Sequence, residues 1–189
     1  SAIGSINDTN PQPLLIRSTL GTYGLCFVGV ITNKDELIEQ YMDVSGGVFS
    51  VHSGGEVNST ELVAALIGRK SSFAEGIRFA QQSIQGSCSM LILQENGNII
   101  AARDYMGRLP VIIAKDDDGY AVSFESYAAE KVGYEVVKEL GSAEIVEIST
   151  EGITVLAEAR EEMKICSFLW SYYGYPTSVY EGVHVEVMR

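Results

Sequence analysis

The first part of the chain alternates strand-like apolar runs with helical spacings of apolar residues. Leu14–Ser18 is a short strand-like run, and Tyr23–Thr32 is an almost unbroken apolar stretch of strand length. A strand that is buried on both faces has this pattern, and glycines inside it permit close backbone approach. Three helices are expected to begin at capping residues that precede a glutamate by three positions: Asn33 with Glu36, Asn58 with Glu61, and Ser72 with Glu75.

From Ser87 onward the pattern changes to short apolar runs separated by turn residues. Asn96-Gly97 and Asp116–Gly119 each lie between two strand-length runs, so two β-hairpins are expected. The aromatic run Cys166–Tyr173 is predicted to be a strand that leaves the domain. Helices followed by many antiparallel strands indicate a layered α+β domain. The remaining predicted elements are a short helix at Ser126–Val132 and strands at Glu135–Leu140, Glu144–Ile148 and Ile153–Ala157.

Composition excludes several classes of protein. The 189 residues, 46% of them hydrophobic, are enough for one core, so one domain is expected. A net charge of -12 argues against a surface that binds nucleic acid or an anionic membrane. The three cysteines are widely spaced and form no CxxC pair, which supports neither a disulfide framework nor a zinc site. No apolar run reaches membrane-spanning length, so a soluble, cytoplasmic protein is expected.

Several segments resemble the amidotransferase domain of the amidophosphoribosyltransferase family. Asn10–Pro13 is similar to that family's N-A-Q-P segment, and Leu25–Asn33 lies where the family has L-x-H-N-G-N-L-T-N. Ala102–Pro110 is similar to A-R-D-P-x-G-x-R-P, and Cys166–Ser178 resembles C-x-F-E-Y-x-Y-F-A-R-P-D-S. The order and spacing of these segments hold along nearly the whole chain.

The resemblance implies an α+β fold of the N-terminal-nucleophile hydrolase type, a four-layer αββα sandwich. In this family of class II amidotransferases the first residue is a cysteine, and its thiolate attacks the side-chain amide of glutamine to release ammonia. Ser1 aligns well inside the family domain, so the fold is expected to be incomplete at the N-terminus and the nucleophile to lie upstream. Residues 1–165 are expected to form the amidotransferase-like domain. Residues 166–189 are expected to be a strand and linker toward a phosphoribosyltransferase-like domain.

The resemblance assigns substrate contacts to Val28, Gly29 and Ser59. Gly29 matches a glycine whose N–H stabilises the oxyanion. Val28 stands where the family has an asparagine that donates a second hydrogen bond, and losing one such donor costs about 3 kcal/mol of transition-state stabilisation. Ser59 stands where an aspartate holds the substrate ammonium group. The pocket is therefore interpreted as degenerate, with no catalytic residue in this chain and with glutamine or another small ligand as its occupant.

The cysteines have competing interpretations. Cys26, two residues before Val28, could be a displaced nucleophile, but an apolar strand raises a thiol pKa, and a small buried hydrophobe is the favoured interpretation for Cys26 and Cys88. Cys166 matches a cysteine that ligates an iron–sulfur cluster in many family members. The other three ligands belong to the phosphoribosyltransferase domain, so no cofactor is expected here.

Four polar residues are interpreted as structural. Arg103 and Asp104 match a family pair, but an ion pair or a turn-forming aspartate at a strand end explains them without catalysis. His52 and His184 are far apart in the sequence, and neither has a ligand-spaced carboxylate or cysteine. No metal site is expected.

Two functions stay open on the sequence. The first is the glutaminase part of an amidophosphoribosyltransferase-like protein, which supplies ammonia to phosphoribosyl pyrophosphate in purine biosynthesis. The second is a non-catalytic scaffold or ligand-sensing domain, which Val28 and Ser59 favour. Self-association is expected through an open edge beside Tyr23–Thr32 and through the aromatic run near the C-terminus. The competing expectation is that Leu14–Ser18 covers that edge.

Overall fold

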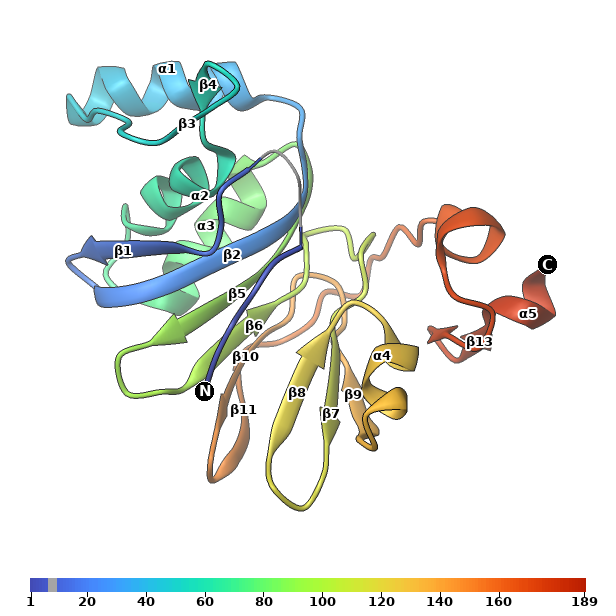
Figure 1. The fold of residues 1–189 in the computed structure, drawn as a ribbon. Helices are drawn as coiled ribbons and strands as arrows, with labels where there is room; N and C mark the ends of the chain where they lie inside the picture. The colour runs from blue at the N-terminus through green and yellow to red at the C-terminus, as the bar shows by residue number, and fades with distance from the viewer. Residues whose placement is uncertain (7–9) are drawn as a thin grey trace.

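Two antiparallel sheets form the middle of the molecule, in a computed structural model that describes residues 1–6 and 10–189 (Figure 1). The larger sheet has six strands in the order β1-β2-β5-β6-β10-β11, and the smaller has the order β8-β7-β9. Both predicted hairpins are present. The larger sheet comprises β1 (Leu14–Ser18), β2 (Gly21–Ile31), β5 (Gly86–Gln94), β6 (Ile99–Ala102), β10 (Ile145–Ser149) and β11 (Gly152–Ala157), and the smaller comprises β7 (Ile112–Lys115), β8 (Tyr120–Ser123) and β9 (Glu135–Glu139).

Helices α1 (Lys34–Ser45), α2 (Ser59–Ile67) and α3 (Phe73–Ser83) form the outer layer on the side of the larger sheet (Figure 1). Alternation along β2 turns Tyr23, Leu25 and Phe27 toward α2 and α3, where they enter the main apolar core. None of the helices among the described residues is long and apolar enough to cross a membrane. A small hairpin of β3 (His52–Ser53) and β4 (Glu56–Val57) precedes α2.

Two of the three predicted helix caps are present. The Asn58 side-chain oxygen accepts hydrogen bonds from the backbone N–H groups of Thr60 and Glu61. The Ser72 hydroxyl accepts one from Glu75 N–H. The cap predicted at Asn33 is wrong, although α1 begins there: the Asn33 amide instead bonds Ser83 and Gln85, so it ties the end of β2 to the end of α3.

The other face of the larger sheet packs on the smaller sheet. Cys26, Leu91 and Val146 meet Val111 and Ile113 in a second apolar core. Helix α4 (Ser126–Lys131) packs against all three strands of the smaller sheet. The layers therefore follow the order helix, sheet, sheet, helix, as predicted for this fold class (Figure 1).

The expected open edge beside β2 is not found along the paired part of the strand. Leu14–Ser18 forms β1, which pairs with β2 from Gly21 to Leu25, and β5 pairs with β2 from Tyr23 to Ile31. The competing expectation, that this segment covers the edge, is the correct one for that half of β2. The two edge strands of the larger sheet are β1 and β11.

The predicted strand at Cys166–Tyr173 is wrong. Leu169–Tyr173 is a short π-helix, closed by a hydrogen bond from Gly174 N–H to Leu169 O at 2.6 Å. An alternating strand would expose Trp170 or Leu169, whereas the coiled backbone buries both beside Tyr180. The segment then continues through β12 (Val179–Tyr180), β13 (Val183–His184) and α5 (Val185–Met188), and lies beside α4 (Figure 1).

Candidate functional site

The three predicted substrate contacts lie on β2 and at the start of α2. Val28 is 37% exposed and pairs with Ser89 across the β2–β5 ladder. Gly29 pairs with Cys88, one position further along. Ser59 is the first residue of α2, directly after the capping residue Asn58. Val28 presents an isopropyl group that donates no hydrogen bond, and Ser59 carries no charge.

Backbone packing requires a glycine at position 29. Its φ is +152°, and a Cβ atom built there would lie 1.9 Å from Ser87 O. Gly86 has the reciprocal role, because a Cβ atom there would lie 2.0 Å from Val30 O. Such close approach between β2 and β5 is available only to glycine. The sequence indicated Gly29 through its family motif, whereas Gly86 carried no motif and was missed.

Gln12 joins β2 to the start of α2, and the sequence analysis did not name it as a site residue. Its side-chain oxygen accepts hydrogen bonds from Phe27 N–H at 3.0 Å and from the Thr60 hydroxyl at 3.3 Å. Asn58, which is fully buried, donates from its amide to Pro11 O at 3.3 Å. The N-P-Q-P motif was the available signal for this junction. Because Gln12 binds Phe27 and Thr60, the junction ties the strand that carries Val28 and Gly29 to the helix that begins at Ser59.

Glu61, the acidic residue nearest in sequence to Ser59, has hydrogen-bond partners in another part of the chain. Glu61 accepts hydrogen bonds from Ser50 N–H and Val51 N–H at 2.9 Å each. It therefore fixes the loop before β3 and does not replace the aspartate that the family resemblance places two residues earlier, at Ser59.

The cysteines of the core have the properties of buried hydrophobes. Cys26 is 5% exposed, its sulfur lies 3.8 Å from Gly4 O, and burial raises the pKa of its thiol. Burial also raises the pKa of Cys88, which is 2% exposed, and the negative charge of Asp104 adds to the shift. Because the thiolate is the nucleophilic form, both residues are unsuited to attack on an amide. Cys166 is half-buried and free.

Arg103 and Asp104 are both buried and both structural in their contacts. Asp104 accepts hydrogen bonds from Met106 N–H at 3.2 Å and from Leu109 N–H at 2.9 Å, so it forms the predicted turn. Arg103 is 1% exposed and pairs with Glu181 at 2.6 Å and Glu139 at 3.7 Å. The sequence did not predict these partners.

The two histidines are separate from the candidate site. His52 and His184 are both exposed. Across residues 1–6 and 10–189, no group of three or more histidine, cysteine, aspartate or glutamate side chains has the arrangement of a metal site.

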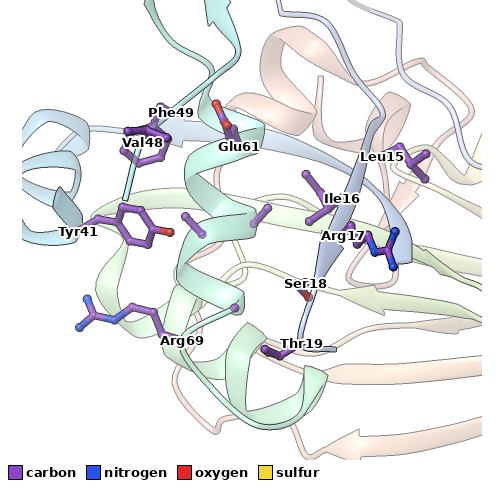
Figure 2. A pocket seen from close by; sticks show the side chains of 13 residues that line it. Leu15, Ile16, Arg17, Ser18, Thr19, Tyr41, Val48, Phe49, Glu61 and Arg69 are labelled. Atoms are coloured by element: carbon purple, nitrogen blue, oxygen red, sulfur yellow. The ribbon is translucent and has the colours of Figure 1, made fainter. Parts of the chain in front are cut away.

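A surface groove of about 590 Å³ lies on the helical side, over α2. Figure 2 shows Leu15 to Ser18 of β1 and the following Thr19 on one side of α2, with Tyr41, Val48 and Phe49 on the other. Val28, Gly29 and Ser59 do not line this groove. It is therefore separate from the positions that the family resemblance assigns to glutamine.

Comparison with known proteins gives the same assignment throughout. A family model described as a glutamine amidotransferase domain matches residues 2–130. Amidophosphoribosyltransferase of Archaeoglobus fulgidus is 26% identical over 191 residues, covering 100% of this chain and 41% of the relative. That of Bacillus subtilis is 30% identical over 184 residues, covering 95% and 37%. The chain thus spans about two fifths of the length of these relatives.

A solved structure shows the same architecture. Glutamine phosphoribosylpyrophosphate amidotransferase from B. subtilis, complexed with ADP and GMP, superimposes with a TM-score of 0.79 and 29% sequence identity. The match covers 93% of this chain and 38% of that one. The sequence model, the relatives and the fold agree on the glutaminase portion of these enzymes, and the chain belongs to the glutamine amidotransferase domain family.

Proposed function

We propose that this chain is the glutaminase part of an amidophosphoribosyltransferase-like protein, which supplies ammonia from glutamine to phosphoribosyl pyrophosphate in purine biosynthesis. The observation that supports it most directly is the match to amidophosphoribosyltransferases over nearly the whole chain, in sequence and in fold. The two-sheet core and the β2–α2 junction are kept as a frame for such a site.

We propose further that the polypeptide of residues 1–189 does not hydrolyse glutamine. Val28 removes one oxyanion donor, and Ser59 removes the charge that selects an amino-acid ammonium group. Cys26 and Cys88 are buried with raised thiol pKa values, so neither supplies the thiolate.

An ammonia-release assay tests this proposal. The purified polypeptide, incubated with glutamine, is expected to release no ammonia above the background of a heat-denatured sample. Turnover that disappears in the Cys26→Ala variant would contradict the proposal and make Cys26 a relocated nucleophile. The matched control is Cys166→Ala, which removes a half-buried thiol far from β2 in the sequence.

A second candidate is a ligand-sensing or scaffolding domain, and Val28 and Ser59 favour it. If the pocket once bound glutamine, Val28→Asn with Ser59→Asp should restore glutamine affinity in a longer polypeptide that includes the upstream segment of the family domain. Calorimetry on that double variant is the measurement. Glutamine binding no stronger than in the parent would show that these two positions are misaligned with the family's substrate contacts.

Two partners follow from the same proposal: a phosphoribosyltransferase-like domain and a second copy of the chain. Exposed aromatic side chains support the first, since Phe168, Tyr172 and Tyr173 are each more than half exposed near the C-terminus. Exposed apolar residues of the edge region, Leu15 and Val30, support the second.

Light scattering tests self-association, and a monodisperse species of 20.5 kDa would exclude it.

A further inference from the structure

The C-terminal segment, residues 166–189, is held together by its own contacts. Trp170 donates from its indole nitrogen to Val183 O at 3.1 Å and packs edge-on against Tyr180. Arg189 donates to the backbone oxygens of Trp170, Tyr172 and Gly174. These bonds close the segment on itself, and its buried side chains pack on Ile112 of β7 in a third apolar cluster.

The segment touches the rest of the molecule mainly around α4 and the smaller sheet. Tyr175 stacks on Tyr127 with ring centroids 4.0 Å apart. Ser178 bonds the carboxylate of Glu125, and Val179 N–H donates to the Ser126 hydroxyl at 2.9 Å. The polypeptide that leads to it, 158–165, is largely exposed. The connection is itself held by hydrogen bonds, from Lys164 N–H to Met106 O at 2.8 Å and from the Ser142 hydroxyl to Glu162 O at 2.8 Å.

One of these contacts joins the carboxylates of Glu139 and Glu181, 21% and 26% exposed, to the buried guanidinium of Arg103. Arg103 lies just after β6, Glu139 ends β9, and Glu181 lies in the turn between β12 and β13. Arg103 bonds Glu181 at 2.6 Å, while its distance to Glu139 is 3.7 Å. Glu139 also accepts a hydrogen bond from Glu181 N–H at 3.0 Å. Two potential negative charges thus share one cation, which favours a proton on one of them.

The position of Glu181 shows that its carboxylate matters for the attachment. Glu181 and Gly182 have φ values of 49° and 74°, so they are the two central residues of a turn that favours asparagine, aspartate or glycine. Glutamate is unfavourable in this conformation. Its longer side chain reaches Arg103, and the pairing offsets the conformational cost.

We propose that the C-terminal segment is a proton-sensitive latch, closed when Glu139 carries a proton beside the Arg103–Glu181 pair and weakened when Glu139 is ionised. In the closed state, Arg103 pairs with Glu181, and a protonated Glu139 relieves the repulsion between the two acids. When the proton leaves, one guanidinium faces two anions in a buried site, and release of the segment lets Glu139 return to water.

The electrostatics agree with this direction. Burial, and next the negative charge of Glu181, raise the pKa of Glu139 to about 7, and the hydrogen bond from Glu181 N–H and the charge of Arg103 offset only part of that shift. A carboxyl with a raised pKa in the closed state stabilises that state at low pH, and the stabilisation is lost as the pH rises through about 7. The other charged groups nearby have partners of their own: Lys138 pairs with Glu144 at 2.8 Å, and Glu125 bonds Ser178.

Hydrogen exchange on the whole chain tests the latch. Between about pH 6 and about pH 8.5, the protection factor of amides in 178–185 is expected to fall about tenfold, after correction for intrinsic exchange, while amides of β6 keep theirs. Trp170 is the single tryptophan and lies inside the segment, so acrylamide quenching of its fluorescence gives a second readout.

Glu139→Gln mimics the protonated side chain and is expected to abolish the pH response while keeping the segment closed. The control variants Glu135→Gln, at an exposed position of the same strand, and His184→Asn, at an exposed position of the segment, are expected to keep the pH response. Equal wild-type protection at both pH values would overturn the proposal. A pH response that persists in Glu139→Gln, or a segment loosened by that change at the lower pH, would also overturn it.

Discussion

The junction of β2 with α2 and the cluster around Arg103 are both buried and polar, but they are built from different chemistry. At the junction, Gln12 and Asn58 make neutral hydrogen bonds to backbone and hydroxyl groups. At the cluster, one guanidinium faces two carboxylates. Loss of one neutral hydrogen bond leaves no unpaired charge, so single changes at the junction are expected to cost less than at the cluster. An ion cluster depends on every member.

The largest effect is expected from removing the cation. In Arg103→Met, two carboxylates lose their common partner, and the backbone oxygens of Leu140 and Gly107 lose a donor. Breaking a buried pair in this way costs about 3 to 5 kcal/mol. Urea unfolding followed by circular dichroism measures the loss. Arg17→Met, at an exposed position, is the matched control and should change stability by less than about 0.5 kcal/mol. A loss below about 1 kcal/mol for Arg103→Met would remove the contrast between the two regions.

The next effect tests the backbone of the candidate site. Gly29→Ala places a methyl group 1.9 Å from Ser87 O, so β2 and β5 must separate locally. We expect destabilisation of about 3 kcal/mol by the same unfolding measurement. Gly119→Ala is the control, because no atom lies within 4 Å of the added Cβ. Similar stability of the two variants would mean that the ladder relaxes easily around position 29, and that its glycine is not required by packing.

The smallest effect concerns the neutral junction itself. Asn58→Ala removes the cap of α2 and the bond to Pro11 O, and a cap is worth about 1 to 2 kcal/mol. Ser72→Ala, which removes the exposed cap of α3, should cost less because water replaces the hydroxyl. An equal loss of unfolding free energy in Asn58→Ala and Arg103→Met would contradict the expected difference between neutral and ionic buried contacts.

Local patterns in the sequence predicted most of the elements. The apolar run of β2, the turns Asn96-Gly97 and Asp116–Gly119, and the capping residues Asn58 and Ser72 each act over a few residues. Their outcome depends on backbone preferences and nearest neighbours, which a single sequence contains. Failures occurred where distant segments compete: Asn33 bonds the end of α3 in place of its own helix.

The sequence by itself indicated the family and most of the elements in their order, and it is the source of the interpretation of Val28 and Ser59 as departures from the family pattern. Only the tertiary structure decided that the aromatic run coils into a π-helix, and that Gln12 joins β2 to α2. It also brought Arg103, Glu139 and Glu181 together from three separate elements. The physical reason is that burial and charge pairing depend on contacts between residues far apart in the chain, and no local pattern encodes which carboxylate will reach which cation.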